Sequence, residues 1–248
     1  MTALMGLTSR LKVAKLHLIT DVRAERGDFR DFVVEALRGG VDLLQVRDAA
    51  ASDEQLLEAL AIAQSAALQL NATVVVGNDV AVASRFQADV LHLGAADGPI
   101  DQARAQLPEH SLVGRSVHRT RQLTGTDADY LMVGPVFGGS LDGVAFPGLE
   151  LVRRAAAKQP LPSPESTPWF AVGGITRENI DQVIEAGALR VAVSSAINDA
   201  ADPQAAAAEL KQQLLDAWNA RPEMSGYALN AFGGGQGLKF INRQVDAR

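Results

Sequence analysis

The sequence predicts a single-domain α/β fold, a (β/α)8 barrel, and three observations support that prediction. Eight short runs rich in Val, Leu and Ile alternate with Ala-rich stretches along most of the 248 residues. The runs begin about 25 residues apart on average, close to the length of one strand plus one helix. Some runs, such as Val74–Val76, are apolar throughout, which is typical of parallel strands covered by helices.

The predicted strands and helices follow one another in chain order. The strands are Leu16–Thr20, Asp42–Val46, Thr73–Val76, Val90–Leu93, Leu112–Ser116, Tyr130–Val133, Trp169–Val172 and Arg190–Val193. Apolar residues recur at the helical spacing of three and four in Phe29–Arg38, Asp53–Leu70, Glu178–Ala186 and Pro203–Trp218. An open doubly wound sheet usually has a Gly-rich turn after its first strand, whereas Thr20 is followed here by Asp-Val-Arg. The pattern therefore favours a barrel of the TIM type.

Two ends of the chain do not fit the repeat. We expect an N-terminal extension over residues 1–15, one barrel over residues 16–218, and a Gly-rich C-terminal extension over residues 219–248. Disorder and docking to a partner are both compatible with the composition of the last segment.

Composition excludes several functional classes. The chain has 23 Lys and Arg against 29 Asp and Glu, a net charge of −6, which argues against a general nucleic-acid binder. It contains no Cys, which excludes disulfides, thiolate metal sites and a Cys nucleophile. No apolar run approaches the roughly 20 residues that span a bilayer, so we expect no membrane partner and a cytoplasmic location. The sequence leaves the oligomeric state open, and a homo-oligomer is compatible with it.

Polar residues are concentrated directly after the predicted strands. In a barrel of this type the active site lies at the carboxyl ends of the strands, so these positions are the candidate site. They are Gln45, Arg47, Asn78, Asp79, His92, Asp97, Ser116, His118, Gly173, Gly174, Ser194 and Ser195.

The ends of the last two strands favour a phosphate site. Loops at these positions commonly bind phosphate through backbone N–H groups, and Gly173 and Gly174 allow a close approach of the backbone. Ser194 and Ser195 add hydroxyl and amide donors. The alternative is that the two glycines form only a tight strand-to-helix turn.

Asp79 and Asp97 follow neighbouring strands and suit a hard cation. Two carboxylates together with substrate phosphate oxygens form a common Mg²⁺ site, so we expect Mg²⁺ as cofactor. Each Asp alternatively caps the helix that follows it.

Strand alternation predicts two further pairs that share a face. Gln45 and Arg47 are two residues apart, and the Arg47 guanidinium suits either a phosphate or a structural ion pair with an Asp. Ser116 and His118 are likewise two apart, and a His at this place suits general acid or base chemistry. The alternative for His118 is a structural hydrogen bond, and His92 is equally compatible with a place in the core.

This set of strand ends resembles the thiamine phosphate synthase family, together with its close relatives the thiazole tautomerases. The resemblance is collinear and extends from about Lys15 to Trp218, essentially the whole predicted barrel. The matching segments are Leu18–Asp21, Gly39–Asp42, Gln45–Asp48, Asn78–Asp79, Asp89–Gly94, Asp97, Gly114–His118, Ala128–Tyr130, Gly134–Phe137, Gly173–Ile175 and Val193–Ile197.

The resemblance implies a reaction and a role for each matching residue. The reaction joins hydroxymethylpyrimidine diphosphate to thiazole phosphate and releases pyrophosphate, through a pyrimidine carbocation that the thiazole nitrogen captures. By position, the Mg²⁺ and diphosphate ligands would be Asn78, Asp79 and Asp97, with Gln45 and Arg47 beside them. Ser116 would lie near the pyrimidine, and the thiazole phosphate would bind at Gly174, Ser194 and Ser195.

Two departures from the family pattern concern the pyrophosphate. The family usually has a Lys two residues after the Arg of the second strand, where this chain has Ala49. The loop after the sixth strand usually contains threonines and a Lys, whereas Gly138–Gly143 contains neither and adds Asp142. Loss of one such electrostatic donor lowers a rate by on the order of 10²–10³. Arg115 and Arg119 are candidate replacements.

These departures leave three functional hypotheses. The first is a thiamine phosphate synthase, a transferase. The second is a thiazole tautomerase, an isomerase that uses His118 as acid and base but has little use for both Asp79 and Asp97. The third is a non-catalytic barrel that binds a phosphorylated ligand.

Overall fold

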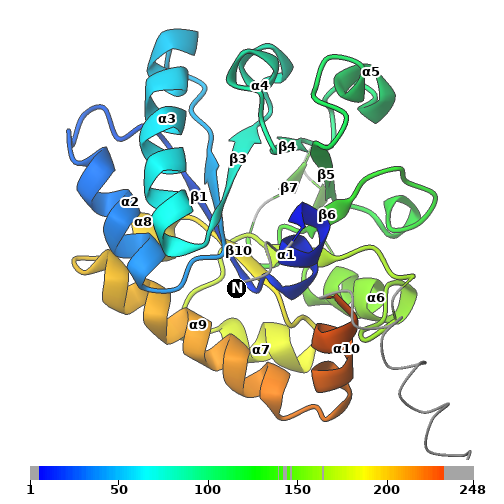
Figure 1. Cartoon of the computed structure of the whole chain (residues 1–248). Helices are drawn as coiled ribbons and strands as arrows, with labels where there is room; N and C mark the ends of the chain where they lie inside the picture. Colours follow the sequence, from blue (N-terminus) through cyan, green and yellow to red (C-terminus); the bar gives the residue numbers. More distant parts are fainter. Residues whose placement is uncertain (1–5, 139, 142–143, 146, 164, 232–248) are drawn as a thin grey trace, which may run out of the picture.

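The computed structural model describes residues 6–138, 140–141, 144–145, 147–163 and 165–231. Eight parallel strands close into a barrel in the order β1-β10-β9-β6-β5-β4-β3-β2, which confirms the predicted (β/α)8 fold (Figure 1). The strands are β1 (Leu16–Thr20), β2 (Leu43–Val46), β3 (Thr73–Gly77), β4 (Val90–Leu93), β5 (Leu112–Val117), β6 (Tyr130–Val133), β9 (Trp169–Val172) and β10 (Val191–Val193).

Helices surround the barrel and connect successive strands (Figure 1). They are α1 (Leu7–Val13), α2 (Phe29–Arg38), α3 (Asp53–Leu70), α4 (Val80–Phe86), α5 (Ile100–Arg104), the 3₁₀ helix η1 (Thr120–Gln122), α6 (Leu149–Lys158), α7 (Ile180–Glu185), α8 (Ser195–Asn198), α9 (Pro203–Asn219) and α10 (Glu223–Ala231). A short antiparallel pair, β7 (Ser140–Leu141) and β8 (Val144–Ala145), lies between β6 and α6.

Local capping explains why the predicted starts of α3 and α9 are accurate. The Ser52 hydroxyl accepts from the Gln55 backbone N–H, and the Gln55 side chain accepts from the Ser52 N–H. This reciprocal capping box satisfies two donors at the start of α3. At the start of α9 the Asp202 carboxylate accepts from the Ala205 backbone N–H, and Pro203 lies in the first turn, where its missing N–H has no cost.

The inward-facing positions become more polar toward the carboxyl ends of the strands. On β2 the inward series begins with Leu43, in an apolar cluster that fills the bottom of the barrel, and continues with Gln45 and then Arg47. On β4 the same series begins with Val90 and continues with His92. The alternation of a strand thus points a polar set of side chains toward one end of the barrel.

The two predicted extensions include helices that contact each other. Leu11 of α1 is buried in the cluster that fills the barrel, and α1 contacts α10. Met224 and Tyr227 of α10 pack against Trp218. The C-terminal extension therefore contains a packed helix over residues 223–231, whereas residues 232–248 lie outside the described part of the chain.

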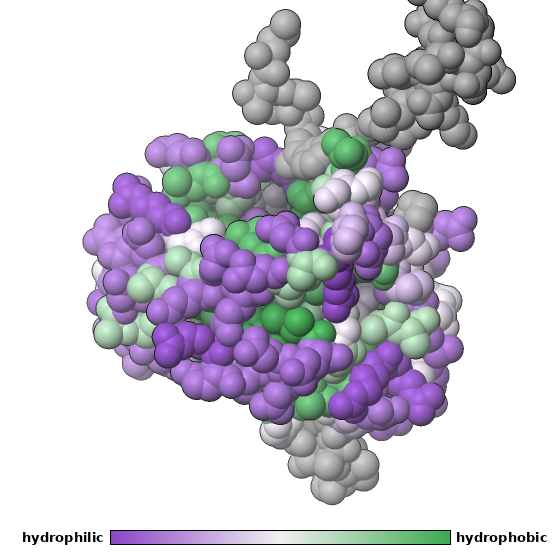
Figure 2. Space-filling view, turned by 90° about the horizontal axis from the view of Figure 1, so that it is seen from below, coloured by the Kyte–Doolittle hydropathy of each residue, from purple (hydrophilic) through white to green (hydrophobic). Residues whose placement is uncertain are grey.

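The outer surface is mainly hydrophilic. Figure 2, which views the molecule from below, shows hydrophilic residues over most of this face and smaller hydrophobic areas between them. Within the described ranges, no helix combines the length and apolar character needed to cross a membrane.

Candidate active site

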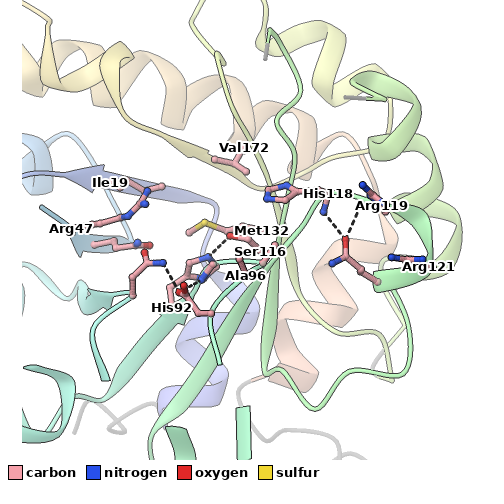
Figure 3. Close-up of a pocket in the computed structure, with 16 residues that line it drawn as sticks. Ile19, Arg47, His92, Ala96, Ser116, His118, Arg119, Arg121, Met132 and Val172 are labelled. Carbon is pink, nitrogen blue, oxygen red and sulfur yellow. Dashed lines mark hydrogen bonds between the residues drawn. The ribbon is translucent and has the colours of Figure 1, made fainter. Parts of the chain in front are cut away.

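A cavity of about 670 Å³ opens at the carboxyl ends of the barrel strands (Figure 3). Its walls combine an apolar group with polar residues that follow strands distant from one another in the sequence. The lining residues are Ile19, Gln45, Arg47, Asn78, His92, Gly94, Ala95, Ala96, Asp97, Ser116, His118, Arg119, Arg121, Gln122, Met132 and Val172. The three predicted catalytic residues, Arg47, Ser116 and His118, therefore meet in one cavity.

Two glycines, one at the end of β3 and one directly after β4, leave room for polar side chains at the cavity wall. A Cβ at Gly77 would lie 2.6 Å from the Arg47 Cβ and 2.9 Å from the Gln45 Nε2. A Cβ at Gly94 would lie 2.9 Å from the Asn78 Nδ2. Since real Cβ contacts are longer than this, any larger residue would displace the side chains that form the site.

The Asp97 carboxylate is fixed at the wall of the cavity. Its Oδ2 accepts from the Asn78 Nδ2 at 2.6 Å and from the Gly94 backbone N–H at 2.7 Å. Arg115 donates to the carbonyl oxygens of Gly94 and Asp97 at 2.9 Å and of Gly98 at 2.6 Å, which holds the same loop from outside. Asp97 is thus positioned by five hydrogen bonds around its own loop.

The Asp79 carboxylate has different hydrogen-bond partners from the Asp97 carboxylate. Its Oδ1 accepts from the Val82 backbone N–H at 2.9 Å and caps α4, which is the alternative that the sequence left open. Asp79 is not among the residues that line the cavity. Among the described residues, no group of three or more His, Cys, Asp or Glu is arranged to hold a metal ion.

Three arginines line the cavity and carry an unbalanced positive charge. In the described part of the chain, the guanidinium groups of Arg47, Arg119 and Arg121 form no hydrogen bond or ion pair with another residue. Asp97 is the one carboxylate among the described lining residues. Figure 3 shows Arg47 on one side of the cavity and Arg119 and Arg121 on the other. The arrangement suits a ligand with several negative charges.

The segment after β5 is held in place by one side chain. The Gln122 Oε1 accepts from the backbone N–H groups of His118 at 3.0 Å and Arg119 at 2.9 Å (Figure 3). The His118 Nδ1 lies 2.6 Å from the Gly134 carbonyl oxygen, and because a carbonyl only accepts, Nδ1 carries the proton. These contacts fix the start of η1 at the mouth of the cavity.

A second pocket of about 510 Å³ lies near the ends of β1 and β2, but its arginines are paired. Arg23 forms two hydrogen bonds with Asp28, at 2.6 and 2.8 Å, and Arg26 contacts Asp199 at 3.0 Å. The contrast identifies the first cavity as the place where cations are available to a ligand.

The predicted phosphate site lies beside the cavity rather than in its lining. Gly174 and Ser194 each follow, by two residues, the paired residues Val172 and Ala192 of neighbouring strands, so these strand ends are adjacent. Gly174, Ser194 and Ser195 are exposed. Gly173 and Gly174 have φ values of +107° and +63°, and a Cβ on either would meet the backbone or side chains of Pro135 and Phe137. Their need for glycine therefore arises from the turn and its packing.

Several residues of the site were not predicted from the sequence. Arg121, Gln122 and Met132 line the cavity, and Tyr130 lies beneath it against His92. Alternation of β6 places Met132 and Tyr130 on the same inward face, a signal that was available. The places of Arg121 and Gln122 depend on the 3₁₀ turn after β5, which no sequence pattern predicted.

Buried histidines give the fold a pH dependence of known sign. Burial, with smaller contributions from Arg115 and Arg47, lowers the pKa of His92 to about 3, and burial lowers the pKa of His17 well below its ordinary value. The unfolded chain therefore binds more protons than the folded one below pH 6.5. The free energy of unfolding falls as pH drops from 6.5 toward 3, by about 1.4 kcal/mol per pH unit for each buried histidine.

Urea unfolding at several pH values between about 6.5 and 4.5 tests this prediction. In the His92→Gln variant we expect a shallower loss of unfolding free energy with falling pH, by about 1.4 kcal/mol per unit. His110→Gln is the control, because His110 is exposed at the surface. Equal slopes in wild type and His92→Gln would contradict a neutral, buried His92.

Comparison with known proteins identifies the family. The family model described as thiamine monophosphate synthase matches residues 16–197, which include all eight strands of the barrel. The chain belongs to this family.

Individual relatives of the thiamine monophosphate synthase family match most of the chain. The thiamine-phosphate synthase of Thermobifida fusca (strain YX) is 42% identical over 216 residues, covering 85% of this chain and 97% of the relative. That of Mycolicibacterium smegmatis (strain ATCC 700084 / mc(2)155) is 43% identical over 218 residues, covering 83% and 94%. A solved thiamine phosphate pyrophosphorylase from Pyrococcus furiosus has a TM-score of 0.72 and 29% identity, covering 84% and 98%.

Proposed function

We propose that this chain is a thiamine phosphate synthase, a transferase that joins hydroxymethylpyrimidine diphosphate to thiazole phosphate and releases pyrophosphate. The observation that carries the proposal is the cavity in a member of this family, where three arginines have no partner among the described residues and one carboxylate is fixed at the wall. The names of the relatives favour the synthase over the tautomerase, since the relatives described above are synthases.

The proposed chemistry is a substitution at the methylene carbon of the pyrimidine. The bond between this carbon and the diphosphate oxygen breaks, and its electron pair leaves with pyrophosphate. The lone pair of the thiazole nitrogen then forms the new carbon–nitrogen bond, which gives the thiazolium ring of thiamine phosphate. Negative charge develops on the leaving oxygen, so preorganised cations near the diphosphate accelerate the step.

We assign the binding of the diphosphate to Arg47, Arg119 and Arg121. These arginines would replace the two lysines that the family usually has, one at the position of Ala49 and one in the loop over residues 138–143. Of this loop, Gly139, Asp142 and Gly143 lie outside the described residues. Arg115, the other candidate replacement, is occupied by three carbonyl oxygens. Arg119 and Arg121 form no such contacts with described residues and line the cavity, which favours them.

We assign Mg²⁺ binding to Asp97, with Asp79 as the second carboxylate implied by the resemblance. The Asp97 Oδ1 accepts no hydrogen bond from another described residue, and Mg²⁺ usually takes one or two carboxylates and completes its shell with phosphate oxygens and water. The residues therefore fit the ion. Bound Mg²⁺ would neutralise charge on the departing pyrophosphate.

The role of Asp79 is separable from its capping of α4. In an Asp79→Ser variant the hydroxyl retains the cap, because Ser is as good an N-cap as Asp, but the negative charge is lost. If Asp79 helps to hold Mg²⁺, we expect the Mg²⁺ concentration for half-maximal activity to rise at least about 10-fold while thermal stability is unchanged. An unchanged Mg²⁺ dependence would restrict Asp79 to the cap.

The remaining substrate groups have candidate sites at the barrel mouth. We assign the thiazole phosphate to the exposed amides and hydroxyls at Gly174, Ser194 and Ser195, with Gly173 shaping the turn. Gln45 and Ser116 are the polar groups for the pyrimidine ring, whose faces suit the apolar side chains nearby. His118 lines the same cavity.

The test of the function incubates purified protein with both phosphorylated substrates and Mg²⁺. We expect thiamine phosphate and pyrophosphate to appear together, and we expect neither product when one of the two substrates is left out. Isomerisation of the thiazole carboxylate phosphate that disappears in His118→Asn would instead support a tautomerase. Binding of both substrates without either reaction would support a non-catalytic barrel.

A further inference from the structure

A chain of three side chains runs from the core of the barrel to the cavity. The Tyr130 hydroxyl lies 3.2 Å from the His92 Nδ1, and the His92 Nε2 lies 2.9 Å from the Ser116 Oγ. Tyr130 and His92 are 0% and 2% exposed, and His92 and Ser116 both line the cavity (Figure 3). Tyr130 is not among the lining residues, so its effect on a ligand passes through His92 and Ser116.

The packing of the barrel interior holds this row of hydrogen-bonded side chains in place. Gly114 lies beside Tyr130 in the register of β5 and β6, and a Cβ there would overlap the Tyr130 ring and lie 2.7 Å from the His92 Nδ1. Phe170 packs edge-on against the Tyr130 ring, with centroids 5.9 Å apart. The two rings of the chain are therefore held in single positions, as expected in a close-packed interior.

The protonation states of the chain are fixed by burial. Burial lowers the pKa of His92 to about 3 and raises the pKa of Tyr130 well above its ordinary value, so both are neutral near pH 7. The chain then has three protons, one each on Tyr130, His92 and Ser116, for two hydrogen bonds. The two hydrogen bonds can both run from Tyr130 toward Ser116 or both from Ser116 toward Tyr130. The first direction leaves the Ser116 hydroxyl proton unused, and the second leaves the Tyr130 hydroxyl proton unused.

Only one direction leaves the buried donors of these three side chains paired. If Tyr130 donates to Nδ1, then His92 carries its proton on Nε2, donates to the Ser116 Oγ, and the Ser116 proton points elsewhere. In the reverse direction the Tyr130 proton is left in the core, where no other described residue offers it an acceptor. A buried donor without a partner is disfavoured, so the first direction prevails.

We propose that Tyr130 and His92 are positioning residues that turn the Ser116 hydroxyl into a hydrogen-bond donor aimed into the cavity. A donor at this place recognises an acceptor atom on a flat ring, because Ile19, Met132 and Val172 supply apolar walls around it. A ring nitrogen of a pyrimidine is such an acceptor. The assignment of this ring as ligand rests on the proposed function, whereas the direction of the chain does not.

The tautomer of His92 tests the direction without any turnover. In protein with ¹⁵N-labelled His, we expect the wild-type His92 signals to show a protonated Nε2 and an unprotonated Nδ1. In Tyr130→Phe, Nδ1 loses its donor, and we expect the other tautomer to become populated. Tyr227→Phe is the matched control, since it removes a buried Tyr hydroxyl near Arg190, and its His92 spectrum is expected to equal that of wild type. A wild-type spectrum with a protonated Nδ1 would overturn the proposal.

A double-mutant cycle tests whether the chain acts through Ser116. We expect Tyr130→Phe to weaken binding of thiamine phosphate, measured by calorimetry, and to raise KM for the pyrimidine substrate, each by about 10-fold, with a smaller change in kcat. In a Ser116→Ala background the same substitution is expected to have no further effect. Additive effects on binding would overturn the positioning role. Absence of turnover with a correct tautomer and coupled binding would refute only the proposed function.

Discussion

We expect the Asp97→Ala substitution to lower kcat/KM for thiamine phosphate formation by on the order of 10³ or more. Two losses combine in this variant. The cavity loses the one carboxylate among its described lining residues, which is the ligand that we assign to Mg²⁺. The Gly94 N–H and the Asn78 Nδ2 also lose their acceptor, so the wall of the cavity is no longer fixed. Steady-state kinetics over a range of Mg²⁺ concentrations measure the effect.

Two further variants separate the losses at Asp97. Asp97→Asn keeps an acceptor for the Gly94 N–H but removes the charge, so we expect it to retain the fold and to lose most of the activity. Asp101→Asn, at the start of α5, removes a nearby charge that takes no part in the site and is expected to have wild-type activity. Near wild-type rates in Asp97→Asn would contradict a role for the Asp97 charge.

Replacement of both Arg119 and Arg121 by Gln is expected to lower kcat/KM by about 10²–10³. The physical reason is the loss of two cations that face developing negative charge and that have no structural partner among the described residues. Because the charges act on the leaving group, we expect the inhibition constant of inorganic pyrophosphate to rise by a similar factor. Competition kinetics with pyrophosphate provide this second measurement.

The matched control for the arginine pair is Arg153→Gln with Arg154→Gln on α6. These arginines form surface ion pairs with Glu150 and are expected to leave both measurements unchanged. Introduction of Lys at Ala49 in the Arg119→Gln/Arg121→Gln variant is expected to recover part of the pyrophosphate affinity. If the Arg119→Gln/Arg121→Gln variant, without the added Lys, has the same inhibition constant for pyrophosphate as wild type, the assignment of Arg119 and Arg121 is contradicted.

The strands and long helices were predictable because their signals are local. Predicted and observed limits coincide for Phe29–Arg38 and Asp53–Leu70, where the apolar spacing is regular and, for the second helix, the Ser52 cap agrees with it. The prediction of Glu178–Ala186 is longer than the observed Ile180–Glu185. There the Asn179 Oδ1 accepts from the Thr176 N–H, which forms a turn before the helix and delays its start.

The site was predictable only where strand alternation determines direction. Gln45 and Arg47 reach the cavity as expected because they lie on one face of β2 and its extension. Asp79 follows a strand end just as Asp97 does, yet its carboxylate turns back to cap α4. The difference depends on loop conformation, including a positive φ of 63° at Asn78, which no residue spacing encodes. The hydrogen bonds of His92 likewise depend on Tyr130, a contact between strands distant in the chain.

The most direct test of the proposed synthase function is the stoichiometry of a single turnover. Excess protein is mixed with hydroxymethylpyrimidine diphosphate, thiazole phosphate and Mg²⁺, the reaction is quenched at intervals, and thiamine phosphate and pyrophosphate are quantified. The synthase function predicts that the two products appear with one rate constant and in equal amounts. Consumption of neither substrate, although both bind, would contradict it, as would pyrophosphate release without formation of thiamine phosphate.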